Sequence, residues 1–125
     1  MSTYIVLKGK SIKDDSTTLN VQLHKTMRLR GDWEVSVISA VLNASNEVLL
    51  WLLCDVVDYS VVNNLSVQLL DIIQTGSEKN TKPMYVKVIK KTFSSINVDI
   101  QKEVNKDELI EFDGEAIIDL HFRKA

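Results

Sequence analysis

Cysteine, alanine, basic charge and long apolar runs are all scarce in this chain of 125 residues. The single cysteine, Cys54, excludes an internal disulfide framework and a cysteine-rich zinc site. The net charge of −2 does not supply the basic face that grips phosphate backbones. Lys87, Lys90 and Lys91 cluster without interleaved aromatic residues, which indicates a solvated face rather than a nucleic-acid groove. We therefore expect no specific nucleic-acid partner.

No run of eighteen apolar residues occurs, so we expect no membrane span. Residues 1–15 lack the basic segment followed by a long apolar stretch that marks a signal peptide. We therefore expect the protein to remain inside the cell that makes it.

Hydrophobic residues make up 45% of the chain, enough to form a core and too many for an intrinsically disordered protein. They include 15 Val and 11 Ile against only 4 Ala. β-branched side chains suit pleated sheets, whereas alanine is the best helix former. The composition is typical of a β-protein, and the length predicts one domain over residues 1–125.

Apolar and polar residues alternate over short segments, as in half-buried strands. Over 33–42, for example, one face is expected to carry Trp33, Val35, Val37 and Val41, and the other Glu34, Ser36 and Ile38. We expect strands over residues 3–8, 17–23, 33–42, 48–57, 65–73, 84–90, 95–101 and 115–123, with a brief continuation at 27–30. Turns are expected at Gly31-Asp32, 43–47 and Asp113-Gly114, and a loop over 74–82. About eight strands at this spacing predict an all-β fold, specifically a single jelly-roll-type β-sandwich. A helix is the alternative over 48–57 and 65–73.

Residues 48–57 are apolar on both faces of a predicted strand. One face carries the even-numbered residues, and the other carries Leu49, Trp51, Leu53, Asp55 and Val57. Strands of antiparallel sandwiches normally keep one face polar, so two interpretations stay open. A loop or chain terminus covers the second face, or that face is a subunit interface. The second interpretation makes Leu49, Trp51 and Leu53 the candidate self-association anchors, whereas Trp33 is expected in the core.

No residue pattern predicts catalysis, a cofactor or a metal ion. His24 and His121 are expected to be surface or edge histidines without the further ligands of a metal site. Asp55 interrupts an apolar strand, and we expect it to be a strand-end residue or the partner of a nearby lysine rather than a catalytic acid. Cys54 lies among apolar residues with no neighbouring base, so we expect an inert thiol. The protein is therefore expected not to be an enzyme.

Several short motifs follow one another along the chain. They are TLNVQL at 18–23, MRLRGDWEV at 27–35, LCDVV at 53–57, PMYV at 83–86, INVDI at 96–100, FDG at 112–114 and LHFR at 120–123. In this order they resemble segments of capsid-associated proteins of Polinton/Maverick elements and the related adintoviruses. Those segments include F-T-x-x-L, L-x-G-x-W-E-V, Y-C-D-V-V and a closing L-H-F-R.

The resemblance implies a penton-like minor capsid protein, a single jelly roll that forms five-fold vertices. The chain departs from this family in two places. In the relatives a long insertion follows the Trp-Glu-Val strand, where this chain has only residues 43–47. Residues 67–73 also lack the basic residue and proline that follow the leucine pair in those proteins. The chain therefore resembles a short, diverged member.

Two functions follow as expectations. The first is a non-enzymatic viral or virus-derived capsid protein that self-assembles, with a pentamer favoured over a trimer and the major capsid protein as a further partner. Such a protein would be assembled inside the host cell and reside in the virion. The second is a small monomeric β-sandwich, such as a domesticated host protein, that binds a carbohydrate or peptide. Tyr4 and Tyr59 are its candidate ligand-contacting aromatics.

Overall fold

A computed structural model of the protein describes residues 2–10, 18–42, 49–62, 64–74, 76–79, 83–101 and 115–125. Its strands are β1 (Ser2–Lys10), β2 (Thr18–Arg28), β3 (Trp33–Leu42), β4 (Leu49–Cys54), β5 (Ser60–Val62), β6 (Leu65–Val67), β7 (Leu69–Gln74), β8 (Gly76–Lys79), β9 (Val86–Lys87), β10 (Thr92–Gln101) and β11 (Glu115–Lys124). These residues form no helix that could span a lipid bilayer. The alternative of helices over 48–57 and 65–73 is wrong, because residues 49–54, 65–67 and 69–73 form strands.

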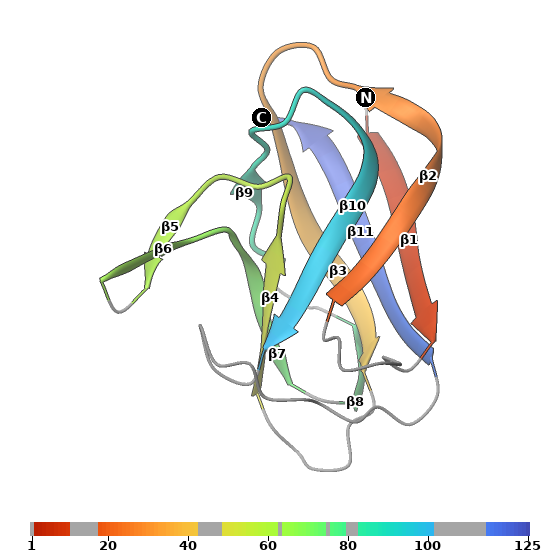
Figure 1. Ribbon diagram of the computed structural model, residues 1–125, viewed down its shortest axis with the longest axis vertical. Coiled ribbons are helices and arrows are strands. Elements are labelled where there is room, and N and C mark those ends of the chain that lie inside the picture. The colour runs from red at the N-terminus through yellow and green to blue at the C-terminus, as the bar shows by residue number, and fades with distance from the viewer. Residues whose placement is uncertain are drawn as a thin grey trace.

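The strands build two antiparallel sheets that face each other (Figure 1). The first sheet has the order β1-β11-β3-β8, with β9 also paired to β3. The second sheet has the order β2-β10-β4-β7. A separate hairpin, β5–β6, projects from the side of the sandwich. The predicted all-β sandwich is confirmed.

The pairing joins strands from opposite ends of the chain. The first strand pairs with the last, β1 with β11, and the next pair inward is β2 with β10. Continuing inward, β3 pairs with β8 and β9, and finally β4 pairs with β7. The contacts β11–β3 and β10–β4 join these antiparallel pairs into the two sheets. The fold is thus an antiparallel ribbon wound back on itself.

The core lies between the two sheets and follows the alternation of each strand. From the first sheet it takes side chains such as Leu7, Val35 and Phe122, and from the second Leu52 and Ile96, all of them fully buried. The aromatic rings of Phe93 on β10 and Phe122 on β11 lie 6.0 Å apart between centroids and link the two sheets. Trp33 is 6% exposed, as predicted for a core residue, and its Nε1 donates to the carbonyl oxygen of Arg30 at 2.9 Å.

A bulge in β3 overturns the predicted faces of that strand. Ser39 pairs with Asp119, but the next pair is Val37 with Leu120, so Ile38 is an extra residue. One extra residue reverses which side chains face the core. Consequently Ala40 and Leu42 are buried and Val41 is only half-buried, contrary to the alternation predicted for Val41.

Other strand boundaries differ from the sequence prediction. The predicted stretches 17–23 and 27–30 meet in one strand, β2 (Thr18–Arg28), in which residues 23–26 bulge opposite Ser94. The predicted strand 65–73 divides at Gln68 into β6 and β7, and the predicted loop 74–82 contains β8. The strand β5 was not predicted. The predicted turns at 43–47 and Asp113-Gly114 lie outside the described residues.

Candidate functional site

The outer face of the second sheet is polar on one half and apolar on the other. Residues paired across antiparallel strands point to the same face of the sheet, so the register shows which side chains share the outer face. On this face β2 and β10 present mainly polar side chains, including Asn20, Asn97, Asp99 and Gln101. The strands β4 and β7 present five apolar side chains, which we call the apolar stripe: Leu49, Trp51, Leu53, Leu69 and Ile72.

The apolar stripe includes all three predicted anchors, Leu49, Trp51 and Leu53. Leu49 is 59% exposed and Ile72 is 38% exposed, while Trp51 and Leu53 are half-buried. The even-numbered residues of this segment are confirmed on the core face, because Leu50, Leu52, Cys54 and Val56 are buried. Val57 was predicted on the outer face, but β4 ends at Cys54, and Val57 is buried in a bridge to Val88. The stripe therefore leaves contiguous apolar surface in contact with water.

The free edge of β7 is protected against pairing with another strand. A bulge lies where Leu52 pairs with Asp71 and Leu53 with Leu69. There the Asp71 side chain, 7% exposed, accepts a hydrogen bond through Oδ1 from the Ile72 backbone N–H at 2.7 Å. Bulges and inward-pointing charges are known means by which edge strands avoid edge-to-edge association. Contacts at this side of the molecule are thus directed to the face of the sheet rather than to its edge.

The hairpin β5–β6 projects from the sandwich at the Cys54 end of β4 (Figure 1), and together with Tyr59 just before it we call it the arm. Its strands have three residues each, and Asn64 near its tip has a φ of 63°, which asparagine tolerates better than most residues. Val61 is 76% exposed, Tyr59 58% and Leu65 41%. The arm therefore carries exposed apolar side chains on both of its faces.

Gln68 and Asp55 fix the base of the arm. The Gln68 side-chain amide donates to the carbonyl oxygens of Asp55 at 3.1 Å and Val57 at 2.9 Å. The Asp55 carboxylate accepts from the backbone N–H and side-chain amide of Asn97 on β10, at 3.1 and 3.2 Å. Its Oδ2 also lies 3.3 Å from Lys90 Nζ, so the predicted pairing of Asp55 with a nearby lysine is confirmed. Asp55 thus joins the end of β4 to β10.

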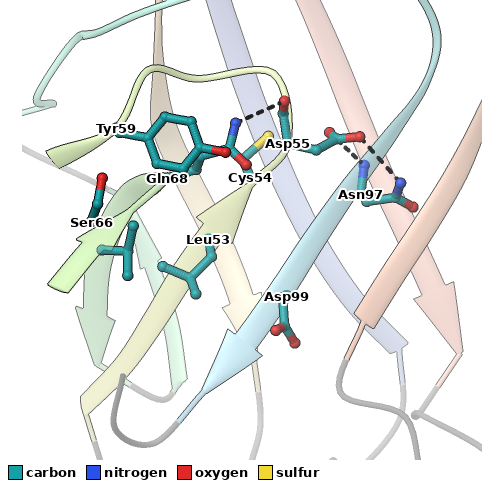
Figure 2. A pocket seen from close by; sticks show the side chains of 9 residues that line it. Leu53, Cys54, Asp55, Tyr59, Ser66, Gln68, Asn97 and Asp99 are labelled. Atoms are coloured by element: carbon teal, nitrogen blue, oxygen red, sulfur yellow. Dashed lines mark hydrogen bonds between the residues drawn. The ribbon is translucent and has the colours of Figure 1, made fainter. Parts of the chain in front are cut away.

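A cavity of about 310 Å³ lies in the angle between the arm and the second sheet (Figure 2). Leu53 and Asp99 line it from the sheet, and Tyr59 and Ser66 line it from the arm. Asp99 accepts a hydrogen bond from the Gln101 side-chain amide at 2.8 Å. Cys54 also borders the cavity, but burial raises the pKa of its thiol to about 12, which matches the predicted inert cysteine.

Cys54 should resist thiol reagents in the folded protein. With a pKa of about 12, about one thiol in ten thousand is ionised at pH 8, and the side chain is 2% exposed. We expect labelling by a chromogenic disulfide reagent at pH 8 to be slow without denaturant and complete within minutes in 6 M guanidinium chloride. Rapid stoichiometric labelling of the folded protein would contradict the described burial.

Asp55 should act as a structural residue. Asp55→Asn removes the charge that attracts Lys90 and places an amide group beside the Asn97 amide, so we expect a loss of about 1–3 kcal/mol in the free energy of unfolding. Lys90→Ala breaks the same ion pair from its exposed partner and should cost less than about 1 kcal/mol. Urea denaturation of both variants measures the difference. Equal losses would show that the salt bridge, rather than the Asn97 hydrogen bonds, accounts for the role of Asp55.

The two histidines differ from each other in environment. His24 is exposed on the edge strand β2, as predicted. His121 lies on the outer face of the first sheet but not at its edge, because β11 is a central strand, and the residue is half-buried between neighbours. The Tyr4 ring stacks on His121 at 4.5 Å between centroids, and the Tyr85 hydroxyl lies 2.7 Å from His121 Nδ1.

The cluster around His121 extends across the outer face of the first sheet. The Arg123 guanidinium lies 3.4 Å from the centre of the Tyr85 ring, and its Nε donates to Glu34 Oε1 at 2.6 Å. Ser36 lies opposite His121 in the register, and its Oγ and His121 Nε2 are buried without a hydrogen-bond partner. Sequence reasoning missed this cluster, because only the pairing of β1, β11, β3 and β9 brings its members together.

The described part of the chain has no further cluster of charged or metal-ligating side chains. No group of three or more His, Cys, Asp or Glu side chains lies close enough there to hold a metal ion. Of the three clustered lysines, Lys90 pairs with Asp55 and Lys91 lies 3.9 Å from Asp32. Comparisons with protein-family models, curated proteins and solved structures found no match to this chain.

Proposed function

We propose that this protein is a capsid structural subunit, a penton-like jelly roll that works by self-assembly rather than by catalysis. Its partners on this proposal are copies of itself and a major capsid protein, and its location is the virion. The observation that carries the proposal is the combination of a wound strand order with an apolar stripe that is partly exposed to water.

The strand order supports the jelly-roll part of the proposal. Counting β1, β2, β3, β4, β7, β8/β9, β10 and β11 as eight successive strands, the pairs are first with eighth, second with seventh, third with sixth and fourth with fifth. An eight-stranded antiparallel ribbon rolled into two sheets has these pairs, and viral capsid domains commonly use this architecture. Of the motifs that resemble the capsid proteins, TLNVQL lies on β2, INVDI on β10 and LHFR on β11, MRLRGDWEV runs from β2 into β3, and LCDVV begins at the end of β4.

The apolar stripe supports the self-assembly part. A monomeric soluble protein rarely leaves a contiguous apolar patch in water, and such a patch marks an interaction site. The stripe contains a tryptophan, one of the residue types that contribute most to binding energy. Neighbouring β10 and β2 supply polar residues on the same face, which provide the polar rim of a typical interface.

Mass measurement in solution tests the proposal. Light scattering on the purified protein at tens of micromolar should give a multiple of the 14.2 kDa chain, and a closed pentamer corresponds to about 71 kDa. A trimer would retain self-assembly and exclude five-fold symmetry. A homogeneous monomer at that concentration would contradict the proposal.

A monomeric ligand-binding module is the second candidate, and the cluster around His121 favours it. Tyr4 is 64% exposed while one face of its ring rests on His121, which leaves a fixed aromatic surface facing water beside Arg123. Aromatic platforms of this kind suit sugar rings. Screening against a glycan panel tests this function. This function predicts that at least one sugar binds the wild-type protein and that Tyr4→Ala lowers its affinity at least tenfold. It also predicts that the protein is monomeric.

A further inference from the structure

We infer that the arm of one copy packs against the apolar stripe of a second copy, an inference that rests on the proposed self-assembly. The arm and the stripe are different surfaces of the chain, so their contact is heterologous. A heterologous contact repeated between identical subunits closes into a ring when the rotation allows it. The inference therefore names both halves of the interface through which a ring would form.

Among the strands that the structure describes, none outside the arm pairs with it. Within the described residues β5 pairs with β6 alone, and neither strand joins either sheet. An isolated two-stranded hairpin is at best marginally stable in water. The arm also leaves Val61, Tyr59 and Leu65 exposed, so packing against another surface would bury the apolar area of these three side chains.

The absence of charge matches the arm to the stripe. Residues 59–67 contain no charged side chain, although 26% of the whole chain is charged. The apolar stripe also contains none. The cores of protein interfaces are depleted in charge, whereas exposed strands that must stay single usually carry lysine or proline. Both surfaces have the composition of an interface core, which favours this contact over contacts with the charged parts of the surface.

The arm does not cover the stripe of its own chain. It leaves the sandwich at the Cys54 end of β4, and Figure 1 shows it pointing away from both sheets. Leu49 lies at the other end of β4, about 13 Å beyond Leu53 at about 3.3 Å per residue. With the arm in place, Leu49 remains 59% exposed and Ile72 38% exposed. The stripe is therefore open to the arm of a neighbouring copy.

Disulfide cross-linking between engineered cysteines tests the inference. Val61→Cys and Leu49→Cys place cysteines at exposed positions. The native Cys54 is buried and its thiol pKa is about 12, so it should not form cross-links. The two variants, made with tags of different mass, are mixed at tens of micromolar and oxidised mildly. We expect a disulfide-linked heterodimer at least fivefold more abundant than a homodimer of either variant. As a control, Asn20→Cys on the polar half of the same face should not cross-link to Val61→Cys.

The other outcomes separate this inference from the proposed function. Homodimers of Leu49→Cys would show stripe against stripe, and homodimers of Val61→Cys would show arm against arm. Either result overturns the inference and leaves self-assembly standing. An absence of cross-links in a protein that light scattering shows to be oligomeric also overturns the inference alone. A monomeric mass for the wild-type protein would overturn both.

Discussion

Trp51→Glu is expected to convert the assembled protein into monomers while its far-UV circular dichroism spectrum stays that of the wild type. Trp51 lies on the outer face of β4, opposite Gln101 and Ile72, and its side chain does not enter the core between the sheets. Removing a central tryptophan and burying an unpaired carboxylate typically costs an interface about 2–4 kcal/mol, or roughly 30- to 1,000-fold in dissociation constant. Light scattering over a dilution series measures the change.

Asn20→Glu provides the matched control for this experiment. Asn20 lies on the outer face of the same sheet, exposed on the edge strand β2, so the substitution adds the same charge outside the apolar stripe. We expect its mass to equal that of the wild type. If the Trp51→Glu variant forms the same oligomer as the wild type, Trp51 does not lie in the interface.

Alanine substitutions on the two faces of β4, Leu52→Ala and Leu49→Ala, should differ by several kcal/mol in their effect on the free energy of unfolding. Leu52 is fully buried, so its truncation should lower the free energy of unfolding by about 2–5 kcal/mol. Leu49 is 59% exposed, so its truncation should change the free energy of unfolding by less than about 0.5 kcal/mol while weakening assembly. Association adds to apparent stability, so both changes are best made in the Trp51→Glu protein and followed by urea denaturation.

The outcome of this pair decides between the two interpretations of the strand. A small loss for Leu49→Ala in the monomer, together with a lower mass in the wild-type background, fits a subunit interface. If both variants lose stability equally, the outer face of β4 is covered within its own chain, and the interface interpretation is wrong.

Strands with strong local patterns were predictable from the sequence. The bounds of β3 were predicted without error, and the outer face of β4 was identified because Asp55 lies on it next to the apolar run. Both predictions rest on the residue-by-residue geometry of a strand, which is local. The bulge at Ile38 could not be predicted, because it depends on which residue of β11 lies opposite, and it reversed the faces beyond it.

Strands and side-chain contacts that depend on residues far away in the sequence were not predicted. The strand β8 has the sequence Gly-Ser-Glu-Lys, with no apolar residue, and it is a strand only because β3 offers it a free edge. The environment of His121 depends in the same way on Tyr4 and Tyr85, which lie far from it in the sequence. Local patterns carry no information about such pairings.

The candidate site shows the same division. The anchors Leu49, Trp51 and Leu53 were predicted, because an apolar run longer than one core face needs is visible in the sequence. Ile72 and Leu69 join them only through the register of β7 against β4. The arm was not predicted, because Gln68 divides what looks like one continuous strand, and its side chain binds carbonyl groups of residues 55 and 57.

Negative-stain electron microscopy of the wild-type protein, fixed at tens of micromolar before dilution onto the grid, tests the central claim most directly. The proposed self-assembling capsid subunit predicts closed rings or shells with one repeated symmetry, and Trp51→Glu treated in the same way should give none. Fields of isolated, featureless small particles from the wild-type protein would contradict the claim.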